Sequence, residues 1–201
     1  GRLVMMLDVE RVLSETSRYD DDFLFRDIEH FRKVMYGPVG DELRASFEKV
    51  GFVALSAYEA GSRSFYAKKP IRSVADMKGL KFRVMQSPIY VKMVEAMGAA
   101  ATPLASGEIY TAAQTGVVDG QENPLSNVAS AKLYEVQKYL SLSGHMYALT
   151  PFMMSKRYWD RLNAADQKLF QEAANEATQF QRKLSKEADD KLQAELKAKG
   201  M

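Results

Sequence analysis

A single arginine, Arg83, stands among apolar residues in the run at positions 80–85. Such a run predicts a strand, and a planar guanidinium can hold a carboxylate through two parallel hydrogen bonds. The alternative is an arginine that is salt-bridged inside the protein or that extends its charged end to water. Arg83 is therefore the first candidate for binding a small carboxylate.

Three further residues could contribute to a carboxylate site. Arg63 lies in a Gly-Ser-Arg-Ser segment that predicts a loop, where an arginine is often solvated. Asn123 precedes Pro124, which favours an extended backbone, and its amide could contact a ligand or bond its own backbone in a turn. His145 follows Gly144 at the start of a predicted strand, where ligand contact and simple packing both stay open.

The alternative to a binding site is an enzyme, with Glu122 or Glu108 as the general base and His145 as the acid. The sequence offers no evident partner for either glutamate and no third group that would orient the pair. It also lacks the GxSxG, phosphate-loop and HExxH motifs. There is no cysteine, which excludes disulfides and thiolate metal sites. We therefore predict no catalytic residue, no metal and no cofactor.

The composition is ordinary for a globular protein, and 201 residues suffice for one large domain or two small ones. With 28 basic and 26 acidic residues, the formal net charge of +2 argues against a nucleic-acid partner. No run approaches the roughly 18 apolar residues of a membrane span. The first residues lack the features of a signal peptide, so we expect the chain to begin after processing or inside a larger protein.

Helix and strand signals alternate and predict an α/β fold with a largely parallel sheet, or two such sheets. Apolar runs predict strands at 52–58, 64–66, 80–85, 101–104, 135–142 and 145–154. Caps and periodicity predict helices at 28–35, 42–50, 88–97, 106–115, 155–159 and 164–199. The last helix is predicted to carry an apolar stripe formed by Leu169, Ala173, Ala177, Phe180, Leu184, Ala188, Leu192 and Leu196.

Several long segments resemble the solute-binding proteins of TRAP transporters, the tripartite ATP-independent periplasmic transporters. The resemblance runs from about Phe23 to the C-terminal helix. The segments that carry it are FLFRDIEHFRKVMYGPVGDELR, GSRSFYAKKPIRSVADMKG, GLKFRV, GEIYTAA, TGVVDGQENP and SGHMYALTPFMMSKRYWDRL.

The resemblance implies a two-lobed fold like that of type II periplasmic binding proteins, with hinge strands and a long C-terminal helix. It implies a periplasmic protein that captures a small organic acid, a C4-dicarboxylate or a sugar acid, and delivers it to a TRAP membrane permease. Arg83 matches the arginine that pairs with the substrate carboxylate, Arg63 a supporting arginine, and Asn123 a substrate-contacting amide. Gln86 and His145 fall in segments that border the ligand cleft.

The resemblance also implies how the chain divides. Residues 1–60 are expected to form the remainder of an incomplete lobe one, because the family's opening βα units precede them. Residues 61–148 are expected to form lobe two with the ligand-anchoring residues, and 149–201 to return to lobe one and form the long helix across the lobes.

Two positions depart from the family pattern. Residues 17–22 are polar where the family usually has a proline and apolar residues, and Ser106 stands where the family often has an aromatic residue that faces the cleft.

Overall fold

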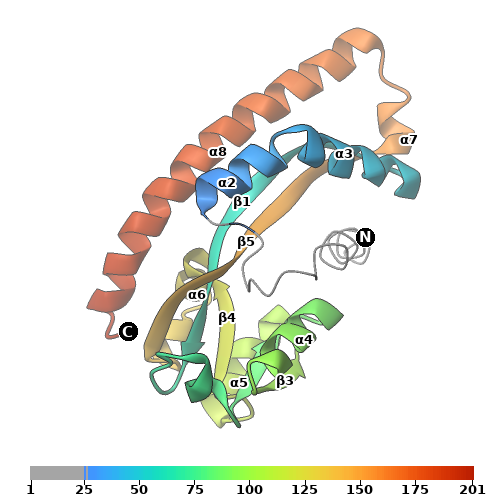
Figure 1. Cartoon of the computed structure of the whole chain (residues 1–201). Coiled ribbons are helices and arrows are strands. Elements are labelled where there is room, and N and C mark those ends of the chain that lie inside the picture. Colours follow the sequence, from blue (N-terminus) through green and yellow to red (C-terminus); the bar gives the residue numbers. More distant parts are fainter. Residues whose placement is uncertain (1–24, 26) are drawn as a thin grey trace. The chain divides into compact units, whose positions relative to one another are not determined.

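The computed structural model describes residue 25 and residues 27–201 (Figure 1). The predicted departure at residues 17–22 therefore lies outside the described residues. The helices are α2 (Ile28–Met35), α3 (Pro38–Ser46), α4 (Pro88–Ala96), α5 (Ile109–Thr115), α6 (Leu125–Ser130), α7 (Lys156–Trp159) and α8 (Ala164–Ala198). The strands are β1 (Phe52–Ala67), β2 (Lys81–Val84), β3 (Ala100–Pro103), β4 (Gly120–Pro124) and β5 (Tyr139–Ser155). The predicted α/β class and the long C-terminal helix are confirmed.

The five strands form one sheet in the order β3-β2-β4-β1-β5. Strand β2 pairs in parallel with β3 and β4, whereas β1 pairs antiparallel with β4. Two of these three pairings are parallel and one is antiparallel, so the sheet is mixed, whereas the sequence predicted a largely parallel one. The predicted strands at 52–58 and 64–66 are one strand, which continues through Gly61 at a φ of 92°. A glycine adopts that angle readily, so the Gly-Ser pair does not end the strand.

The chain divides into two compact units. Unit 1 comprises Gly1–Ala60 and Tyr147–Lys186, and unit 2 comprises Gly61–Met146 and Glu187–Met201. The long strands β1 and β5 and the helix α8 each contribute residues to both units. The sequence predicts boundaries after residues 60 and 148. It also predicts that residues 187–201 belong with residues 149–186, whereas here they belong to unit 2.

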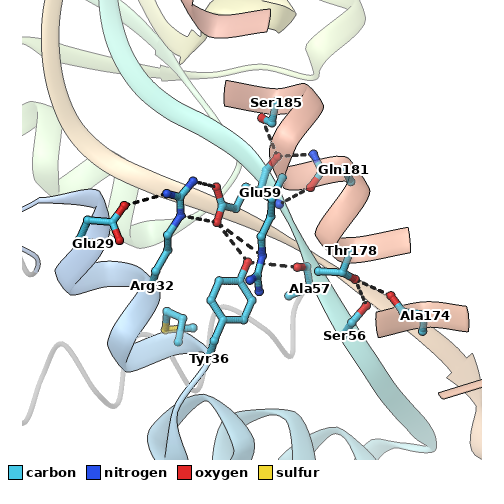
Figure 2. A network of polar contacts seen from close by, with 12 residues as sticks. Glu29, Arg32, Tyr36, Ser56, Ala57, Glu59, Ala174, Thr178, Gln181 and Ser185 are labelled. Carbon is cyan, nitrogen blue, oxygen red and sulfur yellow. Dashed lines mark hydrogen bonds and ion pairs between the residues drawn. The ribbon is translucent and has the colours of Figure 1, made fainter. Parts of the chain in front are cut away.

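In unit 1, buried polar contacts connect α2 and α8 to β1 (Figure 2). The Glu59 carboxylate, 6% exposed, accepts hydrogen bonds from Nε and Nη2 of Arg32 at 2.9 and 2.7 Å. These bonds raise the pKa of Arg32 above its usual value. The Gln181 amide of α8 bonds both backbone groups of Glu59, accepting from N–H at 3.0 Å and donating to the carbonyl at 2.8 Å. The charge-assisted bonds between Arg32 and Glu59 belong to the stronger kind of hydrogen bond in proteins.

The buried side of helix α8 changes in chemistry along its length. In unit 1 the buried side is polar: Gln171 donates to the Leu55 carbonyl at 2.7 Å, and Thr178 donates to Ser56 at 2.6 Å. Leu169 and Phe180, both predicted in the apolar stripe, are 63% exposed, and Leu184 is 47% exposed, so this half of the predicted stripe is not buried. Gln171 and Thr178 face β1 in place of these apolar residues, and they bond the Leu55 carbonyl and the Ser56 hydroxyl of that strand.

The other half of α8 behaves as predicted. In unit 2, Leu196 is 1% exposed and packs with a core formed by Tyr66, Ile109, Leu125, Val128 and Leu133. Leu192 packs against the same cluster. This core lies beside the strands that carry the candidate site residues.

Candidate functional site

Three neighbouring strands of unit 2 carry the predicted site residues. Arg83 on β2 pairs in register with Gln121 on β4, and Asn123 on β4 pairs with Ser64 on β1. Arg63 directly precedes Ser64 on β1 and pairs with Pro124. Backbone pairing between strands far apart in sequence therefore brings both arginines and the Gln-Glu-Asn segment together.

Arg63 does not lie in the loop that the sequence predicted. It lies within β1 and is 4% exposed. Its Nε donates to Oε2 of Glu122 at 2.5 Å, and its Nη2 donates to Oε1 at 2.8 Å and to the Glu122 carbonyl at 3.0 Å. Arg63 also lies over the ring of Tyr90, 5.4 Å from its centroid. The guanidinium is thus engaged by an internal carboxylate.

Glu122, read from the sequence as having no evident partner, is fully buried between two cationic or potentially cationic groups. Besides Arg63, the Nε2 atom of His145 lies 3.4 Å from Oε2, although without hydrogen-bond geometry. Burial alone would raise the pKa of the Glu122 carboxyl, but His145 and Arg63 outweigh it and hold that pKa below its usual value. Glu122 is therefore engaged by Arg63, and its lowered pKa makes it a weak base.

His145 packs inside unit 2. Its ring stacks on Phe65 with centroids 4.2 Å apart, and its Nδ1 lies 2.8 Å from the Ser143 hydroxyl. The His145 side chain is 3% exposed. The sequence left both ligand contact and simple packing open for His145, and the structure shows the packing contact with Phe65.

Arg83 differs from Arg63 in its partners. It is 2% exposed, and its Nε and Nη2 both donate to the Leu104 carbonyl, at 2.9 and 2.7 Å. Within the described part of the chain, no acidic side chain forms an ion pair with it. Burial lowers the pKa of Arg83, and the nearby charge of Arg63 lowers it further, against the raising effect of Glu122. Nη1 is the nitrogen that these contacts leave for a ligand.

Polar groups that lack partners lie on the same elements. The side-chain amide of Asn123 donates to Oε1 of Gln121, and its Oδ1 accepts from the side-chain amide of Asn127 at 3.2 Å. Nε2 of Gln121 and Oγ of Ser87 are buried and have no hydrogen-bond partner among the described residues. Buried polar atoms are rarely left in that state. Neither Ser87 nor Gln121 stands out from the sequence as a site residue.

The other residues named from the sequence lie at the surface. Gln86 and Ser106 are exposed, at the end of β2 and at the start of the short 3-10 helix Ser106–Glu108. Glu108 is also exposed and accepts a hydrogen bond from the backbone N–H of Ala105 at 2.9 Å. Among the described residues no contact joins Glu108 to His145, so the Glu108–His145 version of the enzyme alternative's acid–base pair is not assembled.

A separate pocket lies on unit 1, between α3, β1 and α8. Its lining includes Tyr36, Arg44, Leu55, Gln171 and Arg182, and none of the residues predicted for the site belongs to it. Within residues 25 and 27–201, no group of three His, Cys, Asp or Glu residues could hold a metal ion. Nor do these residues form a helix long and apolar enough to cross a membrane.

Comparison with known proteins gives consistent matches over most of the chain. The model of a family described as bacterial extracellular solute-binding protein, family 7, matches residues 8–201. A solute-binding protein of Verminephrobacter eiseniae is 43% identical over 194 residues, which are 96% of this chain and 58% of that protein. The C4-dicarboxylate-binding periplasmic protein DctP of Rhodobacter capsulatus is 34% identical over 182 residues, 90% of this chain and 55% of that protein.

The fold has solved counterparts. The structure of a TRAP periplasmic solute-binding protein from Xanthobacter autotrophicus, with bound β-D-galacturonate, matches with a TM-score of 0.85 and 38% identity. The match covers 89% of this chain and 60% of the other. This chain therefore spans less than two thirds of the length of these relatives. The resemblance to TRAP solute-binding proteins that the sequence carries is confirmed.

Proposed function

We propose a function from one premise, which is that this chain belongs to family 7 of the bacterial extracellular solute-binding proteins. The chain provides the carboxylate-binding part of a periplasmic protein that captures a small organic acid. Arg83 is the anchor for the ligand carboxylate. The complete protein delivers the acid to a TRAP membrane permease, and it performs no covalent chemistry on the ligand.

The observation that carries this proposal is a buried cation, Arg83, that pairs with no anion among residues 25 and 27–201. Arg83 is 2% exposed and has a backbone carbonyl as its hydrogen-bond partner, whereas Arg63 has Glu122. Burying an arginine without a counter-charge is costly, and an ionised carboxylate is the partner that its planar donor group fits. A carboxylate from solution would supply the missing charge.

Neutral polar groups on β4 and at the residue before α4 support the same function. The free amide nitrogen of Gln121 and the hydroxyl of Ser87 can bond the carboxylate or the hydroxyl groups of an organic acid. Asn123 contributes an amide, and Arg63 supports the site through Glu122 and Tyr90. We assign Gln86 and His145 to the border of the site. The relatives compared above are associated with a hexuronate and with C4-dicarboxylates, which are small carboxylates of the class proposed here.

Titration calorimetry with a panel of organic acids tests the proposal. Arg83→Ala should weaken binding by about 2–5 kcal/mol, part of which is the cost of leaving a buried charge unpaired. Arg83→Lys should weaken it less than alanine does, because lysine keeps the charge but loses the planar donor pair. Arg72→Ala, which removes an exposed arginine of the same unit, is the matched control and should bind as the parent does. If folded Arg83→Ala bound as tightly as the parent, the arginine anchor would be wrong.

A further inference from the structure

The charges buried around Arg83 leave one positive charge unbalanced, and from this we propose that the site selects acids with one carboxylate over acids with two. The inference rests on the proposed function and chooses between the ligand classes that it leaves open. The discriminating residue is Glu122, and the favoured ligands are hydroxylated monocarboxylates such as sugar acids.

The charge count uses the buried side chains of unit 2. Its buried residues that are charged at neutral pH are Arg63, Arg83 and Glu122. Both oxygens of Glu122 accept hydrogen bonds from Arg63, so those two charges cancel locally. Arg83 remains as the one cation of this set without an anion. One ligand carboxylate would complete the balance.

A second carboxylate would meet unfavourable surroundings in unit 2. Arg63 has already committed Nε and Nη2 to Glu122, and the Glu122 charge would repel another anion. Like charges placed together at a binding site are a common way to reject a wrong partner. A hydroxyl group costs no such repulsion, and it can bond Gln121 Nε2, Ser87 Oγ or the Asn123 amide.

Matched acids test this selectivity. D-erythronate and meso-tartrate share one carbon skeleton and differ in whether the far end is an alcohol or a carboxylate, and D-galactonate and galactarate differ in the same way. Calorimetry on the unmodified chain should show that at least one monoacid binds tenfold or more tightly than its matched diacid.

Two substitutions assign the selectivity to its residue. Glu122→Gln should lower the monoacid-to-diacid affinity ratio at least tenfold, because it frees the charge of Arg63. Glu95→Gln removes an exposed carboxylate of the same unit and should leave the ratio unchanged. If Glu122→Gln does not fold, as judged by circular dichroism, the affinity ratio of the parent chain still decides the question.

The outcomes separate this inference from the proposed function. If neither monoacid binds more tightly than its matched diacid, while Arg83→Ala abolishes the binding, the selectivity is overturned and the function stands. A parent ratio that favours the monoacid, together with a folded Glu122→Gln that keeps that ratio, removes Glu122 as its cause and overturns the charge argument. Failure of all four acids to bind would overturn the sugar-acid class and count against the proposed function as well.

Discussion

Arg63 and Arg83 are both buried, but their guanidinium groups have different partners. Arg63 is held by both oxygens of Glu122, and Arg83 donates to the carbonyl of Leu104. Removing one member of such a buried pair destabilises the folded chain, chiefly because the remaining charge is left without a partner. An arginine without an acidic partner retains the capacity to attract one. The distinction between a structural and a binding arginine therefore follows from which of them already has a carboxylate.

The pairing of Glu122 predicts a specific loss of stability in acid. Its folded-state pKa is lowered, so its contribution is complete above the unfolded-state pKa and is lost as the pH falls through the folded-state pKa. The difference in unfolding free energy between the parent and Glu122→Gln should therefore shrink between about pH 5 and pH 3, near and below the usual glutamate pKa. Denaturant titrations at several pH values measure it.

Glu172→Gln is the control for the pH experiment. Glu172 lies on α8 in an exposed pair, 3.8 Å from Lys168, and such pairs contribute little. Its difference from the parent should stay close to zero across the same range. A Glu122→Gln difference that widened on acidification would show that Glu122 is not an ionised partner of Arg63.

At this scale the sequence allowed part of the site to be predicted. Arg83 could be singled out because a single arginine in an apolar strand is expected to be buried, and a buried charge requires a partner. The partnership of Arg63 with Glu122 could not be found, because it depends on the antiparallel register of β1 and β4 between residues far apart in the chain. The predicted loop at Gly61 concealed it further, since it placed Arg63 outside any strand.

The elements position these side chains through close packing at the start of β4. A Cβ added to Gly120 would lie 2.6 Å from the Phe82 ring and 2.7 Å from the Tyr66 carbonyl oxygen. Phe82 and Tyr66 are both fully buried, and one of the clashing atoms belongs to the backbone. Only glycine fits between β2 and β1 at this position, immediately before Gln121.

Gly120→Ala should therefore destabilise the chain by about 1–3 kcal/mol, the usual cost of overpacking a core. It should also weaken acid binding, because the strand that carries Gln121 and Glu122 must shift. Gly107→Ala is the matched control, since nothing lies within 4 Å of an added Cβ there and the residue is in a helical turn. Thermal unfolding of both variants measures the contrast, and equal melting temperatures would contradict the close packing of β4.

The two halves of α8 give a second prediction about an element. Leu196→Ala should cost about 2–5 kcal/mol, as for other large residues removed from a core. Phe180→Ala should change stability by no more than about 0.5 kcal/mol, because its side chain is mostly exposed. Periodicity alone predicts similar losses for both, since it places both residues on one stripe. Comparable losses on chemical denaturation would therefore favour the sequence interpretation over the structure.

For the molecule as a whole, the α/β class and the long helix were predictable because strand and helix signals alternate and the last helix has a clear cap. Asn163 accepts from the N–H of Asp166 at 2.9 Å, as a cap should. The mixed sheet was not predictable, because strand direction depends on pairing between distant segments. The polar face of α8 was missed for a related reason: Gln171 and Gln181 bond backbone groups of β1, which apolar periodicity does not register.

A structure of the chain with a bound acid such as D-galactonate tests the central claim most directly. The measurement is the distance from the ligand carboxylate oxygens to the guanidinium nitrogens of Arg83. The proposed anchor predicts at least one such distance of about 2.7–2.9 Å, with Arg63 still paired to Glu122. A ligand carboxylate bound elsewhere, with Arg83 still bonded to Leu104 alone, would contradict the account.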